Sequence, residues 1–126
     1  MKKVFSVLAC VCALGLTGCS EPVVPSEQVD KLTLAFLDAK VYASGAVVCE
    51  PKKVAERAYV GCSNKSLDGQ SKVSLWLYED GIFKAVNGTA RTFSEGRFSG
   101  NAAVGVLPVP IPVDIKIDEV MAAFKP

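Results

Sequence analysis

The sequence contains no histidine, the side chain that proteins use most often as a general base and as a metal ligand. It also lacks a G-x-S-x-G elbow, a serine followed three residues later by a lysine, and the glycine-rich loops that bind phosphate groups. Two pairs of adjacent carboxylates, Glu79-Asp80 and Asp118-Glu119, are explained by a turn and by the start of a helix. The sequence therefore predicts a protein that is not an enzyme and that needs no cofactor or metal ion.

An excess of charge of one sign is also missing, since the chain has 14 basic and 13 acidic residues. Without Lys2 and Lys3, 12 basic residues face the same 13 acidic ones. No basic stripe emerges along the chain, so nucleic-acid binding has no electrostatic footprint. The length and the high apolar content suit one domain with one core.

Only one long hydrophobic run is present, from Val4 to Leu16, and it is shorter than the roughly 20 apolar residues that a membrane-spanning helix needs. The run follows Lys2 and Lys3 and leads through small residues to a cysteine. This order is typical of a secretory signal that is removed from the mature protein.

The residues at the end of the run, Leu16-Thr17-Gly18-Cys19, resemble the lipobox of bacterial lipoproteins. The resemblance covers only the leader and the first mature residue. It implies that residues 1–18 are a lipoprotein signal peptide, that Cys19 carries the acyl chains, and that residues 19–25 form a lipidated tether. Because Ser20 rather than an acidic residue follows the cysteine, it also implies a lipid anchor in the outer membrane, facing the periplasm of the cell envelope.

The five cysteines agree with this compartment. Cys10 and Cys12 leave with the leader, Cys19 is the lipidation site, and Cys49 and Cys62 remain in the mature domain. Exported proteins meet an oxidising environment, so we expect this pair to form one structural disulfide. A redox centre or a zinc site is the alternative, but the spacing differs from C-x-x-C and the chain has no histidine.

Residues 26–126 form the predicted single periplasmic domain, and its first element is an amphipathic helix. Ser26 is expected at the N-cap and Gly45 at the end, with apolar residues at three- and four-residue steps: Val29, Leu32, Phe36, Ala39 and Ala43. The apolar stripe can pack on a sheet or dock a partner, and the small size of the chain favours the sheet. The tether up to Pro25 is expected to be too polar to pack.

Short β-type segments follow the helix. Pro51 to Lys53 and Asn64 to Ser71 are expected as connections, while Asp80-Gly81 and Asn87-Gly88 indicate tight hairpins. The expected strands are Ala46 to Glu50, Arg57 to Ser63, Lys72 to Tyr78, Ile82 to Val86 and Thr89 to Phe93.

The last part of the chain carries Pro108, Pro110 and Pro112 at every second position. In a strand these prolines would remove donors from one edge only, so Val109, Ile111 and Val113 could pair with the sheet through the other. The alternative is an exposed polyproline II ligand. After Asp118, a short C-terminal helix is expected, with Val120, Met121 and Phe124 on one face.

Trp76 and Tyr78 are the candidate binding face. They alternate with Val73, Leu75 and Leu77, so if those aliphatic residues face the helix, the two aromatic residues lie on the opposite side of the sheet. Large aromatic residues often dominate interfaces. The alternative is that the proline-rich segment covers them and makes them core.

These elements predict an α+β fold, in which the N-terminal helix packs on an antiparallel β-meander of about four to five strands, with a short C-terminal helix and one disulfide. For function, we expect a membrane-anchored, non-catalytic interaction module with a protein partner, such as an accessory subunit of a secretion, conjugation or pilus assembly. One alternative is a small periplasmic inhibitor or exclusion lipoprotein, for example a lysozyme inhibitor, which would use the loop Asn64 to Ser71 or Ser94 to Asn101. A small-ligand carrier is a second alternative.

Overall fold

The computed structural model describes residues 23–106, 112 and 114–124. It contains three helices and six strands within these residues. In chain order they are α2 (Ser26–Asp38), β1 (Ala46–Val54), β2 (Arg57–Ser66), β3 (Gly69–Gln70), β4 (Ser74–Glu79), β5 (Ile82–Ala85), α3 (Gly88–Glu95), β6 (Val104–Val106) and α4 (Ile117–Ala123).

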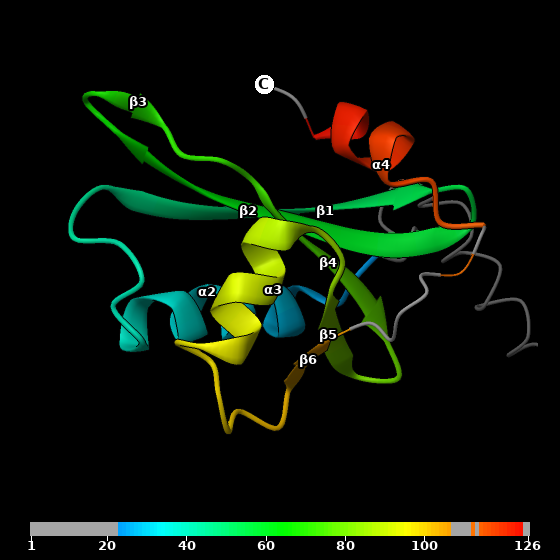
Figure 1. Ribbon diagram of the computed structural model, residues 1–126, viewed down its shortest axis with the longest axis horizontal. Helices are drawn as coiled ribbons and strands as arrows, with labels where there is room; N and C mark the ends of the chain where they lie inside the picture. Colours follow the sequence, from blue (N-terminus) through cyan, green and yellow to red (C-terminus); the bar gives the residue numbers. More distant parts are fainter. Residues whose placement is uncertain (1–22, 107–111, 113, 125–126) are drawn as a thin grey trace, which may run out of the picture.

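The six strands form one mixed sheet with the order β1-β2-β4-β5-β6, and β3 extends it as a short partner of β2 (Figure 1). All pairs are antiparallel except β5 with β6. A parallel pair needs a crossover connection, and α3 supplies it between these two strands. The predicted α+β fold, with its N-terminal helix, largely antiparallel sheet, C-terminal helix and disulfide, is confirmed.

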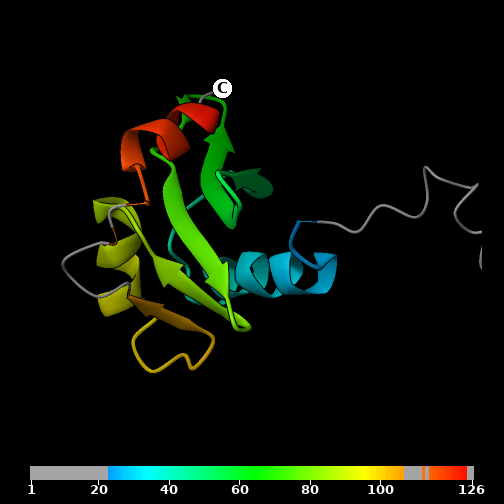
Figure 2. The ribbon, with the colours of Figure 1, turned by 90° about the vertical axis from the view of Figure 1, so that its right-hand side faces the viewer.

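Helices cover both faces of the sheet (Figure 2). On one face, α2 packs Val29, Leu32 and Phe36 onto sheet residues that include Val60, Trp76 and Phe83, and Ala90 of α3 joins the same cluster. On the other face, the residues packed around α4 are Tyr59, Leu75, Leu77, Val86, Ile115, Val120 and Phe124. The alternation along β4 was predicted, but the aliphatic residues face α4 rather than α2.

The end of α2 comes seven residues before the predicted end at Gly45. The backbone N–H of Val41 donates to Phe36 O at 3.2 Å and that of Lys40 to Leu37 O at 3.1 Å, with Lys40 at φ 50°. These are the bonds of a Schellman motif, which ends a helix through one left-handed residue. Because lysine rather than glycine occupies that position, the sequence carried no stop signal there. Ser26 is the first helical residue, and Pro25 takes the N-cap position.

The connection predicted at Pro51 to Lys53 is wrong, because β1 continues through these residues to Val54. The chain reverses instead at Ala55 and Glu56, which have φ values of 47° and 71°. Positive φ at both central residues is the geometry of a type I′ hairpin turn. Proline is tolerated here because β1 lies at the edge of the sheet.

The predicted strand from Thr89 to Phe93 is also wrong, since these residues belong to α3. Asn87 has φ −100°, whereas a type I′ turn needs a positive φ there. Its side chain accepts a hydrogen bond from Ala90 N at 3.0 Å and caps the helix. The same side chain accepts from Leu75 N at 2.9 Å and donates to Val73 O at 2.8 Å, so it also fixes the start of β4.

Two further predictions fall at the ends of the described chain. Val24 is buried in the core beside α2, which corrects the expectation that residues 19–25 do not pack. The predicted proline-rich edge strand lies mostly outside the described residues, which exclude Pro108, Val109, Pro110, Ile111 and Val113. Pro112 is described; it is exposed and belongs to no strand.

Candidate functional site

Trp76 and Tyr78 do not form an exposed face. Trp76 has 0% of its surface exposed, and its indole N–H donates to Ser74 Oγ at 3.0 Å inside the core. Tyr78 is half-buried, with its ring centroid 5.0 Å from that of Phe83. The two residues pack in the cluster that contains the apolar face of α2, so the candidate binding face is corrected to core.

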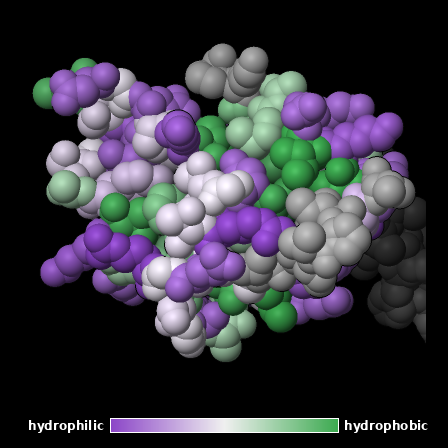
Figure 3. All heavy atoms as spheres, viewed as in Figure 1, coloured by the Kyte–Doolittle hydropathy of each residue, from purple (hydrophilic) through white to green (hydrophobic). Residues whose placement is uncertain are grey.

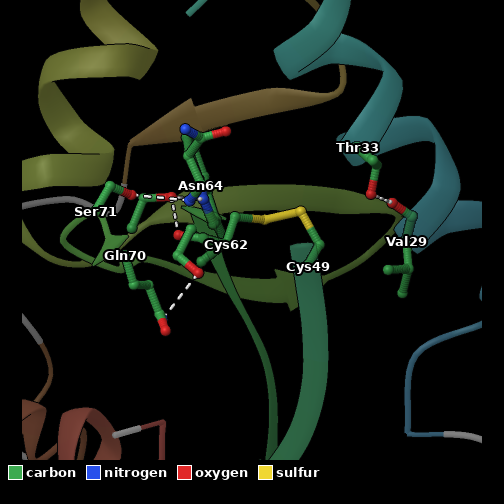
Figure 4. The surroundings of a disulfide bond; sticks show 10 residues. Val29, Thr33, Cys49, Cys62, Asn64, Gln70 and Ser71 are labelled. Carbon is green, nitrogen blue, oxygen red and sulfur yellow. Dashed lines mark hydrogen bonds between the residues drawn. A yellow bond between two sulfur atoms is a disulfide. The ribbon is translucent and has the colours of Figure 1, made fainter. Parts of the chain in front are cut away.

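Cys49 and Cys62 form the predicted disulfide across β1 and β2 (Figure 4). The two residues are directly opposite each other in the strand register, and their Cα atoms are 4.1 Å apart. The bridge faces the α2 side of the sheet, where Cys62 is fully buried. Cys62 is also the last residue of β2 that pairs with β4. The bridge therefore joins β1 and β2 at the point where β2 separates from β4. Cys19 lies outside the described residues.

Beyond the disulfide, β2 and β3 form a hairpin, Asn64 to Ser71, that projects from the body of the sheet (Figure 1). At its base, Asn64 N donates to Ser71 Oγ at 2.8 Å, and Ser71 N donates back to Asn64 O at 2.9 Å. Asn64 Nδ2 also donates to Ser44 O at 2.7 Å and joins the base to the segment after α2. These bonds hold the hairpin in one direction relative to the fold.

Hydrogen bonds also fix the tip of the hairpin. Asp68 N donates to Ser66 Oγ at 3.3 Å, and this hydroxyl donates to Gly69 O at 3.4 Å. Gly69 has φ 128°, a value that side chains disfavour, so glycine suits this turn. The tip is thus held in shape before any partner binds, which lowers the entropy cost of binding.

Leu67 at the tip exposes 106% of its reference area, more than the other exposed large hydrophobic residues of the described chain. Figure 3 shows hydrophobic atoms at the far end of the projecting hairpin, surrounded by hydrophilic ones. A single exposed leucine is ordinary on a protein surface. A leucine held clear of the fold on a braced hairpin is suited to enter a pocket of another molecule.

A pocket of about 110 Å³ opens beside this hairpin on the α4 side of the sheet. Val48, Val73 and Phe124 supply apolar walls, and Glu50 and Lys65 supply charged groups. Gly61 forms part of the lining. Phe124 packs directly over it and leaves no room for a side chain at this position. The pocket is too small for a large ligand, but it has room for one small apolar group.

A charged cluster lies near the other end of the same sheet face. Arg57 Nη2 is 2.7 Å from Asp114 Oδ2, and Arg57 Nη1 is 3.3 Å from Glu79 Oε2. The hydrogen bond from Arg57 lowers the pKa of Asp114, and burial raises the pKa of the adjacent Tyr59 phenol. Lys84 also pairs with Glu79 at 3.0 Å, so both carboxylates are engaged in ion pairs. The pair with Asp114 attaches the segment before α4 to β2.

Within residues 23–106, 112 and 114–124, no group of three or more histidine, cysteine or carboxylate residues is arranged to hold a metal ion. None of the described helices is long and apolar enough to cross a membrane. No protein family, no curated protein and no solved structure matches this chain.

The sequence predicted the position of the hairpin but not its structure. Asn64 to Ser71 is expected as a loop that an inhibitor could use, but β2 reaches Ser66 and the short strand β3 follows it. The serine and asparagine residues in the segment are a turn signal. Their mutual bonds depend on strand register, which was not visible in the sequence. The other predicted loop, Ser94 to Asn101, begins in α3 and continues as turns.

Proposed function

We propose that this protein is a lipid-anchored, non-catalytic interaction module of the bacterial cell envelope. Its anchor is Cys19 in the outer membrane, and the domain faces the periplasm. The sequence Leu16-Thr17-Gly18-Cys19 supports the anchor. A protein partner within an envelope assembly of the secretion, conjugation or pilus type is the finer form of this proposal.

The observation that carries the proposal is the position of the hairpin relative to the tether. Cys19 precedes α2 by only a few residues, and the hairpin base is bonded to Ser44, after the end of α2. In Figure 1 the described chain enters α2 from the right and the hairpin projects at the left. The 13 residues of α2 span about 20 Å at 1.5 Å per residue. A domain tethered at one end thus presents an exposed leucine at the other.

An inhibitor is the second candidate, because a braced hairpin with an exposed Leu67 is also suited to enter an enzyme cleft. The two candidates share the anchor and the hairpin. They differ in what Leu67 contacts.

The anchor is tested by fractionating cells that express the full chain or its Cys19→Ser variant. We expect the parent chain in the outer-membrane fraction and the variant outside it, because Cys19 is the only proposed attachment point for several acyl chains. Cys12→Ser is the matched control, since it replaces a leader cysteine outside the lipobox. Membrane retention of Cys19→Ser equal to that of the control would contradict the proposal.

A further inference from the structure

We propose that two copies of this chain associate through their hairpins, with Leu67 of each copy inserted into the pocket beside Phe124 of the other. This inference rests on the proposed function, because the two copies are brought together by their anchors in one membrane. It identifies a second copy as a partner of the module.

The size and lining of the pocket fit this occupant. A dry cavity of about 150 Å³ is known to accept benzene. A pocket of about 110 Å³ therefore has room for one aliphatic side chain, which would lie against Val48, Val73 and Phe124. Polar residues, Ser63 and Gln70 among them, complete the lining. Val48 is 39% exposed, so insertion of a leucine would cover apolar surface on both copies.

The positions of the leucine and the pocket allow a closed pair. Lys65 lines the pocket and lies two residues before Leu67 on the same hairpin. When a projecting group and its receptor are neighbours on one surface, a two-fold axis between two copies can bring each group to the other receptor. With this axis perpendicular to the membrane, both tethers lie on the same side.

Charge also favours this occupant. Asp68 follows the entering Leu67, and the receiving pocket carries Lys65 and Glu50. Lys52 pairs with Glu50 at 3.8 Å, so Lys65 is the lining charge that is left for Asp68. Both residues are exposed, and neither has an ion-pair partner among the described residues. The reciprocal arrangement would form two pairs, Asp68 of each copy with Lys65 of the other. Confinement to one membrane raises the effective concentration of the copies, so a small interface is sufficient.

A charge exchange in the full chain tests the pairing. Two differently tagged copies are expressed together, and their association is measured by co-purification from membranes in mild detergent. We expect Lys65→Glu in both copies, or Asp68→Lys in both copies, to reduce association at least tenfold, because each change places like charges together. A Lys65→Glu copy with an Asp68→Lys copy should restore association, since both cross pairs are again opposite in charge.

Site-specific crosslinking identifies what Leu67 contacts. An aliphatic diazirine amino acid replaces Leu67 in the full chain, and the same amino acid at Leu37, which is 52% exposed on α2, is the control. We expect a product of twice the chain mass from position 67 only, with crosslinked peptides that contain Val73 or Phe124.

Three results would overturn the inference: no doubled product from position 67, its crosslinking to another protein or to lipid instead, or no recovery in the charge-exchanged pair. Crosslinking is read in whichever cell fraction contains the chain. Loss of membrane retention therefore refutes the anchor alone, and loss of the doubled product refutes the dimer alone.

Discussion

Gly61 and Phe124 form a contact whose energetic coupling can be measured. A Cβ atom built on Gly61 would lie 2.5 Å from Phe124 Cδ1, closer than such atoms approach in proteins. Gly61→Ala must therefore push the Phe124 ring away from the sheet. Overpacking of this kind costs about 1–3 kcal/mol. Because Phe124 belongs to the α4 core cluster and is only 6% exposed, Phe124→Ala should cost about 3–5 kcal/mol.

The double variant separates this contact from two independent losses. With alanine at position 124 the ring is gone, and the new methyl group at position 61 occupies part of the space. We therefore expect the double variant to lose little more than Phe124→Ala alone, with a coupling energy of at least about 1 kcal/mol, within the range for residues in contact. Gly105→Ala is the control, since its Cβ would lie 3.8 Å from the nearest heavy atom, Ile82 Cγ2.

The assay is urea unfolding followed by the fluorescence of Trp76, the only tryptophan of the chain. Its complete burial predicts a large signal change when the core opens. Gly105→Ala should change the free energy of unfolding by no more than about 1 kcal/mol, because its Cβ meets only an ordinary contact and the remaining effect is on the unfolded chain. Costs of Gly61→Ala and Phe124→Ala that add within about 0.5 kcal/mol would refute the contact.

Two further predictions concern the disulfide and the charged cluster. Replacing Cys49 and Cys62 by alanine should lower the free energy of unfolding by about 3 kcal/mol, because their separation of 13 residues closes a loop of moderate size; a urea-derived loss below about 1 kcal/mol would contradict this. Arg57 lowers the pKa of Asp114 in the folded state, so the unfolded state binds the proton more readily, and stability should fall as the pH drops from the ordinary aspartate pKa toward the lowered one. Asp114→Asn should flatten this acid loss of melting temperature, and an unchanged pH profile would count against the ion pair.

The sequence predicted those parts of the fold that depend on local pattern. The apolar spacing of Val29, Leu32 and Phe36 identified the buried face of α2, and Asp80-Gly81 identified a hairpin whose residues have φ values of 56° and 78°. These signals are sufficient because helix period and turn conformation are set by neighbouring residues.

The predictions failed where a residue type is compatible with two structures, where a turn lacks its usual residue, or where tertiary packing decides. Asn87-Gly88 is a hairpin signal, but the asparagine side chain caps α3 instead. Lys40, Ala55 and Glu56 adopt positive φ without glycine, so the ends they create had no local signal. The side of the sheet that Trp76 faces depends on which helix covers it, a choice made by tertiary packing. The hairpin was found as a turn-rich segment, but its exposed leucine and its neighbouring pocket required the strand register.

The burial of Val24 has a mechanical consequence for an anchored domain. Val24 is five positions after Cys19, so the chain between their Cα atoms reaches at most about 17 Å. If Cys19 carries the proposed lipid, a pull on that lipid would reach the hydrophobic core directly, through Val24 and the packed face of α2. The disulfide lies one strand further along the chain and would keep β1 and β2 joined if α2 were torn away. Under load, α2 should therefore yield before the bridged strand pair.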